Sequence, residues 1–184
     1  MLAKIEESIV LFVDFQPKFM ATMPDAAAVV SRANFLGRVA QRLGVPILAT
    51  EQYPERMGQS DPNLFESMDA LPLECIMAKM EFSAFRAPGM KEALQAFGRR
   101  QVIVAGVETH ICVNQTVQDL IDAGYAAILA TDAITGRGED ARAGAIRRMV
   151  AAGAIESHTE SITYEWMESA SNPAFRDILG MVKG

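Results

Sequence analysis

The sequence contains few cysteines, no block of basic residues and no long apolar segment, and each shortage excludes a class of protein. Two cysteines among 184 residues are too few to build a disulfide-stapled scaffold. No segment approaches the roughly 18 consecutive apolar residues that a membrane-spanning helix needs. The first residues lack the basic region, long apolar stretch and cleavage site of a signal peptide. We therefore expect a cytoplasmic protein with reduced thiols and no membrane partner.

The charge balance argues against a nucleic-acid partner. Seventeen basic residues stand against 23 acidic ones, a net charge of -6, whereas nucleic-acid-binding domains are usually basic. Half of the residues are apolar and 22% are charged, which is typical of a folded globular protein. The length suits a single domain, and no linker or repeat divides the chain. We therefore expect one domain over residues 1–184.

Short apolar runs alternate along the chain with segments of helical periodicity. Strands are predicted at residues 9–13, 45–50, 74–78, 101–105 and 125–130, with a possible short sixth at 154–156. Helices are predicted over 26–43, 89–97 and 140–152, and a further helix is predicted to begin near His110. Gly44 is expected to end the first of them. This alternation is typical of right-handed βαβ units. It predicts an α/β fold, a three-layer αβα sandwich around a mainly parallel sheet.

The longest irregular stretch covers residues 51–73 and is rich in Pro, Gly, Ser, Asp and Asn. A loop of this length in a compact domain is usually functional, often a lid. A mobile surface excursion explains the length equally well.

Three chemically active residues follow predicted strands, at the edge of an open α/β sheet where ligands bind. Asp14 closes the first strand, Lys79 closes the third, and Cys112 lies in the turn that opens the helix after the fourth. Taken singly, each has an ordinary explanation: a turn residue, a solvated lysine and a small buried apolar group. Taken together, they supply a base, a cation and a nucleophile at one edge.

The expected geometry brings these groups within reach. Strands two positions apart lie roughly 10 Å apart, a distance that an extended Lys79 side chain mostly covers. A helix N-terminus and a nearby ammonium both favour a thiolate. We therefore expect Cys112 to be the reactive thiol, with Asp14 taking its proton and returning it later. Cys75 lies in the predicted third strand and is expected to be core.

Five segments resemble the isochorismatase-like cysteine hydrolases. They are VLFVDFQPKF (10–19), ATEQYP (49–54), AKMEFSAF (78–85), GVETHICVNQTV (106–117) and TDAITGR (131–137). GVETHICV is the most specific, and the similarity extends over about residues 8–168. Within the superfamily the chain is most similar to isochorismatase-domain-containing proteins of uncertain substrate, which share a late S-x-P-x-F-x-x-I stretch beginning at Ser171.

The resemblance implies a fold and a mechanism. The fold is a Rossmann-like sheet of strand order 3-2-1-4-5-6. The implied catalytic triad is Asp14, Lys79 and Cys112. The family also carries a non-proline cis peptide before the cysteine, here Val107–Glu108, which helps to aim the backbone amides of Glu108 and Cys112 as an oxyanion hole.

Two departures from related families refine the expected chemistry. Nicotinamidases hold a metal through histidines in the loop after the second strand, whereas EQYPERMGQSDPNL (51–64) contains none. We therefore expect no metal, and the absence of G-x-G-x-x-G and P-loop motifs gives no support to a nucleotide cofactor. Isochorismatases can carry glycine in place of the cysteine, so the retained Cys112 favours thiol chemistry.

Seven further residues are candidates for the substrate pocket. Gln16 is placed to orient Asp14, Arg137 to bind an anion, and the aromatic residues to wall the pocket, although ordinary packing or solvation explains each equally well. The candidates are Phe15, Gln16, Tyr53, Phe82, Phe85, Thr109 and Arg137.

The sequence thus favours a metal-independent cysteine hydrolase that acts on a small amide, imide or carbamoyl compound. Two alternatives stay open: vinyl-ether hydrolysis that needs no thiol, and a non-catalytic binding or scaffold protein. We also expect a homo-oligomer, with the 51–73 loop and the segment around Trp166 as candidate contact surfaces.

Overall fold

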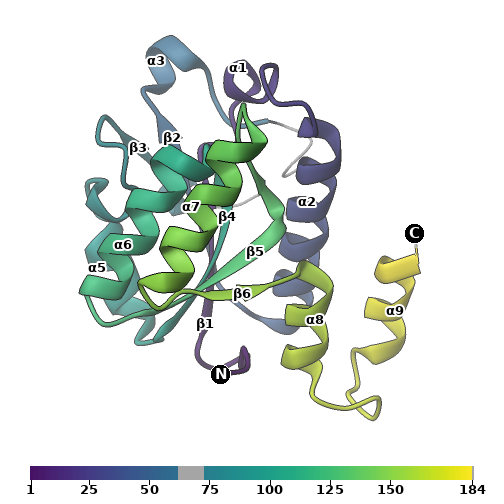
Figure 1. Ribbon diagram of the computed structural model, residues 1–184. Helices are drawn as coiled ribbons and strands as arrows, with labels where there is room; N and C mark the ends of the chain where they lie inside the picture. Colours follow the sequence, from purple (N-terminus) through teal and green to yellow (C-terminus); the bar gives the residue numbers. More distant parts are fainter. Residues whose placement is uncertain (62–72, 184) are drawn as a thin grey trace.

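The computed structural model describes residues 1–61 and 73–183 and contains one sheet of six parallel strands (Figure 1). The strands pair in the order β3-β2-β1-β4-β5-β6, so the order implied by the resemblance is confirmed. Their bounds are β1 (Ser8–Val13), β2 (Ile47–Gln52), β3 (Ile76–Lys79), β4 (Gln101–Val107), β5 (Ala126–Thr135) and β6 (Ile155–Ser157).

Helices cover both faces of the sheet, which confirms the three-layer sandwich (Figure 1). One face carries α2 (Ala26–Leu43), α8 (Thr159–Met167) and α9 (Phe175–Lys183). The other carries α5 (Met90–Phe97), α6 (Asn114–Asp122) and α7 (Glu139–Ala151). The shorter elements are α1 (Pro17–Met20), α3 (Pro54–Met57), the 3-10 turns η1 (Leu73–Cys75) and η2 (Ala84–Arg86), and the π-helical turn η3 (Thr109–Val113).

The central strand β1 is apolar at five successive positions because both of its faces are covered. Val10 and Phe12 pack into the core beneath α2, α8 and α9. Ile9, Leu11 and Val13 alternate with them and pack into the core beneath α5, α6 and α7. Side chains of a strand point alternately to its two faces, so a continuous apolar run is what a doubly covered parallel strand requires.

A glycine lets β4 approach β1 closely at the carboxyl end of the sheet. Gly106 has φ +144°, and a Cβ built on it would lie 2.3 Å from the Val13 carbonyl oxygen. Any other residue would push the two strands apart next to Asp14 and Glu108. The close strand spacing at this edge therefore depends on Gly106.

One expectation about the fold is wrong. The third strand begins at Ile76, so Cys75 ends the 3-10 turn η1 and is partly exposed instead of lying within a strand.

Trp166 belongs to the core. Its side chain is only 2% exposed and donates a hydrogen bond from Nε1 to Ser8 Oγ at 2.9 Å. The segment around it stays a predicted contact surface.

The fold bears on two further expectations. Residues 62–72 of the 51–73 loop lie outside the described residues, so its predicted role as lid or contact surface is not addressed there. Across residues 1–61 and 73–183, no helix has the length and apolar character that crossing a bilayer demands.

Candidate active site

Asp14 lies immediately after β1 with its carboxylate almost entirely buried. Thr50, on the neighbouring strand β2, donates its hydroxyl to Asp14 Oδ1 at 2.8 Å. The ammonium of Lys79 donates to Oδ2 at 2.7 Å. The residue has φ +55°, a left-handed conformation that aspartate tolerates better than most residues. Such conformations cluster at functional sites because the surrounding structure must enforce them.

Lys79, the last residue of β3, reaches past β2 to Asp14, as the strand spacing predicted. Its side chain is fully buried. Besides Asp14, the ammonium donates to three oxygens, those of the Gln52 side chain (2.6 Å) and of the Glu81 (3.2 Å) and Phe82 (3.1 Å) carbonyls. Four acceptors surround three N–H bonds, so Lys79 is held in one place and its charge is directed at Asp14.

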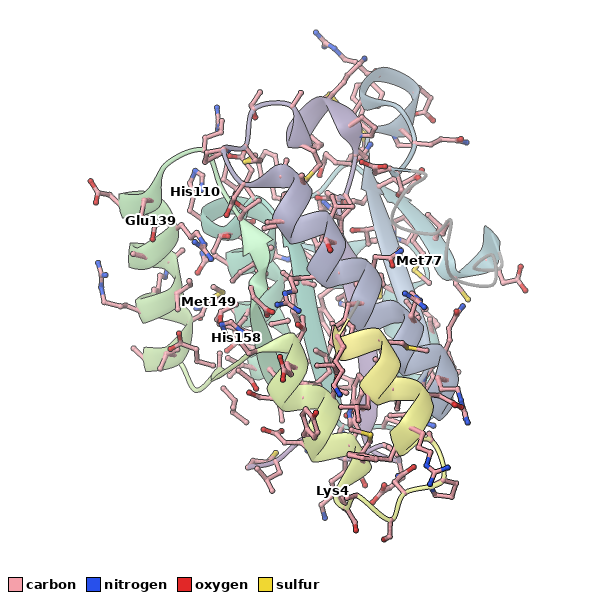
Figure 2. All side chains as sticks on the ribbon, turned by 90° about the vertical axis from the view of Figure 1, so that its right-hand side faces the viewer. Lys4, Met77, His110, Glu139, Met149 and His158 are labelled. Carbon is pink, nitrogen blue, oxygen red and sulfur yellow. The ribbon has the colours of Figure 1, made fainter. Side chains whose placement is uncertain are left out.

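Cys112 completes the cluster from η3, the helical turn between β4 and α6. Its thiol lies beside the Asp14 carboxylate and the backbone N–H of Glu108, which shift its pKa in opposite directions. His110, in the same turn, lies near Glu139 at the start of α7 (Figure 2). A π-helical turn is uncommon and is frequently found at functional sites. The structure thus brings Asp14, Lys79 and Cys112 together at the carboxyl edge of the sheet.

Burial dominates the electrostatics of Cys112. Burial and, next, the charge of Asp14 raise the pKa of Cys112 to about 12, whereas Lys79 lowers it, as expected, by a smaller amount. At neutral pH the resting sulfur is therefore a protonated thiol, and a base must take its proton before it can attack.

The carboxylate is correspondingly basic. Burial raises the pKa of Asp14 above its ordinary value, although Lys79, Thr50 and Cys112 all act in the opposite direction. A buried carboxylate with a raised pKa accepts a proton more readily than a solvated one. The transfer of a proton from Cys112 to Asp14 also changes no net charge within the buried cluster.

The peptide bond between Val107 and Glu108 is cis, as the resemblance implied. It lies where β4 leads into η3. Both residues line the cavity in front of Cys112. The Glu108 side chain accepts a hydrogen bond from Arg137 Nε at 2.7 Å, and the Arg137 side chain is 58% exposed. Arg137 therefore binds a carboxylate of the protein itself.

A small cavity of about 70 Å³ opens onto the thiol and the carboxylate. It is lined by Asp14, Phe19, Gln52, Phe82, Val107, Glu108, Ile111 and Cys112. The sequence did not identify three of these. Gln52 ends β2 between the strands of Asp14 and Lys79, so the strand-end rule could have found it. Ile111 adjoins Cys112, whereas Phe19 carries no comparable signal.

Six of the seven candidate pocket residues, Gln16 and Arg137 among them, do not line this cavity. Phe15 packs in the core with its ring edge-on to Phe12 (centroids 5.8 Å apart). Phe85 packs against Tyr125 (6.3 Å) and lines a different cavity of about 250 Å³. Tyr53 is 39% exposed, and Thr109 is completely buried. Only Phe82, among the candidate aromatic residues, lies on the cavity.

Gln16 positions the neighbouring loop and does not orient Asp14 through its side chain. Its amide nitrogen donates to the Gln52 carbonyl (3.0 Å) and to the Gly58 carbonyl (2.6 Å), while its Oε1 accepts from the Gln52 backbone N–H (2.8 Å). Two of these bonds hold the end of β2, and the third holds Gly58 after α3, so Gln16 bridges the two. Gln16 thereby supports Gln52, which does line the cavity.

Within the part of the chain that the structure describes, no three His, Cys, Asp or Glu side chains lie together in a way that could hold a metal ion. The donors that the cluster does offer are one thiol and one carboxylate, which already contact each other and Lys79.

The family model described as "Isochorismatase domain" matches residues 8–161. Among curated proteins, mouse isochorismatase domain-containing protein 2A is 33% identical over 179 residues, covering 97% of this chain and 84% of the mouse protein.

Two solved structures share the architecture over nearly the whole chain. The MAR1 ribonuclease of Caenorhabditis elegans has a TM-score of 0.92 and 27% identity, covering 100% of this chain and 93% of that one. The protein YcaC from Pseudomonas aeruginosa, solved with hexane-2,5-diol and covalent acrylamide, has a TM-score of 0.88 and 26% identity, covering 98% and 91%.

Proposed function

The chain belongs to the isochorismatase family, and from that premise we propose that it is a metal-independent cysteine hydrolase that cleaves a small amide, imide or carbamoyl compound. One observation carries the proposal: a buried thiol and a basic carboxylate line one small cavity, and a buried ammonium pairs with that carboxylate from behind. A nucleophile beside a base that a third group orients is the signature of covalent catalysis.

The first half of the reaction forms a thioester. When the substrate enters, Asp14 takes the proton of Cys112, and the sulfur attacks the carbonyl carbon. The carbonyl oxygen becomes an oxyanion, which the backbone amides of Glu108 and Cys112 are proposed to stabilise. Asp14 then gives its proton to the departing nitrogen as the C–N bond breaks.

The second half releases the acid. Asp14, again a carboxylate, takes a proton from a water molecule, and the resulting hydroxide attacks the thioester carbon. The sulfur leaves and regains its proton from Asp14. Throughout the cycle Lys79 is the positioning residue: its ammonium lies 2.7 Å from the Asp14 carboxylate and offsets whichever negative charge, carboxylate or thiolate, is present.

Two observations support a small amide as the substrate. The cavity, at about 70 Å³, is well below the roughly 300–1,000 Å³ that drug-sized ligands occupy. The similar YcaC structure from Pseudomonas aeruginosa contains covalent acrylamide, a small amide whose double bond reacts with nucleophiles such as thiols. We carry this reactivity over to Cys112 as part of the proposal.

A ribonuclease activity is the second candidate, because the similar Caenorhabditis elegans structure is described as a ribonuclease. RNA affinity comes largely from basic side chains that contact phosphates. This chain has a net charge of -6, and the charged residues that line the cavity are Asp14 and Glu108, both acidic. These properties favour a small substrate over RNA.

A panel of small amides, imides and carbamoyl compounds tests the proposal, together with a vinyl-ether substrate and single-stranded RNA. We expect turnover of a C–N substrate that Cys112→Ala abolishes and that dialysis against a chelator leaves unchanged. Turnover of the vinyl ether by Cys112→Ala would favour acid catalysis by Asp14 alone. Cleavage of RNA alone would favour the ribonuclease, and no turnover of any substrate would favour a binding protein.

A further inference from the structure

We propose that the Cys112 cavity excludes anionic substrates, so that the compound hydrolysed is a small uncharged amide with an apolar remainder. This inference rests on the proposed function for the reaction but concerns which molecules enter the cavity. It depends on where each charge around the cavity lies, and on what each charged group already binds.

The cavity wall is mainly apolar. Phe19, Phe82, Val107 and Ile111 supply its hydrocarbon surface. A buried anion loses its hydration and regains stability only where a cation or several hydrogen-bond donors face it. The wall offers little of either, and the Gln52 side chain already binds Lys79 and the Met80 carbonyl.

The charged groups that line the cavity are both acidic. Asp14 and Glu108 are the charged residues among those that line the cavity. An anionic substrate would therefore approach two charges of its own sign in a confined site of low polarity, where like-charge repulsion is strongest.

Neither nearby cation is free to compensate. Lys79 lies behind Asp14, is fully buried and has four oxygen acceptors around its ammonium. Arg137 holds Glu108 from the solvent side, with its own side chain more than half exposed. In the Glu108–Arg137 pair the carboxylate is the buried partner and the guanidinium the solvent-exposed one. A vinyl-ether substrate that carries carboxylates, the alternative raised by the sequence, would meet the same repulsion.

Two thiol reagents that differ only in charge test this directly. Iodoacetamide is uncharged and iodoacetate is an anion, and each forms a C–S bond as iodide leaves and the thiol proton is lost. For each thiol we take the ratio of its rate with iodoacetamide to its rate with iodoacetate. We expect this ratio to be on the order of 100-fold larger for Cys112 than for a free thiol such as 2-mercaptoethanol. Peptide mass spectrometry separates Cys112 from Cys75, which serves as a partly exposed internal reference.

Two matched variants test which charged side chain causes the selection against the anionic reagent. Glu108→Gln removes a charge from the cavity wall, and we expect it to raise the relative rate of iodoacetate at Cys112 by about tenfold. Glu139→Gln removes an equal charge from an exposed position on α7 and should leave the ratio unchanged. Ratios are compared, so a general change in reactivity does not affect the result.

The proposal is overturned if iodoacetate and iodoacetamide modify Cys112 in the same ratio as they modify 2-mercaptoethanol, or if Glu139→Gln shifts the ratio as much as Glu108→Gln. Neither result depends on turnover. If the proposed function is wrong and this inference is right, Cys112 will still select against the anionic reagent, but the protein will hydrolyse no amide.

Discussion

The two ends of the central sheet both bury polar side chains, but only one of them buries charge. At the amino end, Gln101 accepts from the Lys4 backbone N–H (2.8 Å) and from Ser8 Oγ (3.2 Å), and its amide nitrogen donates to the Leu2 carbonyl. Trp166 donates to Ser8 in turn. These side chains are neutral and satisfy one another, and Figure 2 shows Lys4 far from His110 at the opposite end.

At the carboxyl end, the buried groups include a full ion pair, and a thiol beside it faces a cavity. Lys79 and Asp14 lie 2.7 Å apart with side-chain exposures of 0% and 1%. A saturated neutral network stabilises a fold, whereas a buried ion pair is weak evidence for stability. The comparison teaches that the neutral end holds the N-terminal segment against α8, whereas the charged end is where the proposed mechanism transfers protons.

The largest effect is expected from Cys112→Ala. It removes the nucleophile, and we expect turnover of a confirmed amide substrate to fall by on the order of 10⁴-fold. The thiol is small, so the free energy of unfolding should change by only about 1 kcal/mol. Steady-state kinetics and urea unfolding measure the two effects on the same sample. Retained turnover with a folded variant would remove Cys112 from the mechanism.

The second prediction concerns the ion pair itself. Lys79→Met leaves the Asp14 carboxylate buried without its cation, which we expect to lower the free energy of unfolding by about 3–5 kcal/mol. Urea unfolding followed by circular dichroism measures it. Adding Asp14→Asn removes both charges and should recover part of the loss.

The matched control for Lys79 lies at the neutral end. Gln101→Met breaks hydrogen bonds without stranding a charge, so we expect a smaller loss of about 1–3 kcal/mol. If Gln101→Met destabilises the protein as much as Lys79→Met, the proposed difference between the two ends is wrong.

The third prediction is that Cys112 titrates far above an ordinary thiol. Because its pKa is raised to about 12, its rate of alkylation by iodoacetamide should rise about tenfold per pH unit from pH 7 to pH 10. The rate for 2-mercaptoethanol should level off above its own pKa within this range. Levelling of the Cys112 rate below pH 9 would show that its pKa is not raised.

The same shift has a consequence for stability. The unfolded thiol, with a pKa near 9, loses its proton before the folded one, so between about pH 9 and 12 the folded state binds more protons. The contribution of Cys112 is fully present below pH 9, and the free energy of unfolding falls as the pH rises toward 12. Cys112→Ala should reduce that slope, which unfolding curves at several pH values would show.

The strand periodicity and the carboxyl-end rule predicted the positions of Asp14, Lys79 and Cys112, because a parallel sheet brings its strand ends to one edge. The same approach misjudged Phe15 and could not give the pKa of Cys112. Proximity in sequence does not fix the direction of a side chain, and Phe15 follows a residue with φ +55° and packs into the core. The pKa of Cys112 depends on depth of burial, which is a property of the assembled layers.

Element boundaries at the edge of the sheet were the least predictable part. The short β3 pairs with β2 alone, so its start is set by tertiary contacts and not by the apolar run that begins earlier. Cys75 was therefore predicted to lie in β3, although it belongs to the preceding turn η1. The central strands, covered on both faces, allow no such freedom, and the predicted β1 differs from the observed strand by a single residue.

The smallest effect is expected at the neutral end, from Trp166→Phe. The change removes the hydrogen bond from Nε1 to Ser8 Oγ and leaves part of the indole volume unfilled, which together should lower the free energy of unfolding by about 1–3 kcal/mol. Ser8 keeps its bond to Gln101, so the network loses one member and no charge is stranded. Because the site lies at the other end of the sheet, kcat/KM should stay within about twofold of the wild-type value. Circular dichroism must follow the unfolding, since Trp166 is the only tryptophan. A loss of turnover larger than the loss of folded protein would mean that the two ends are coupled, and the division of labour between them would have to be abandoned.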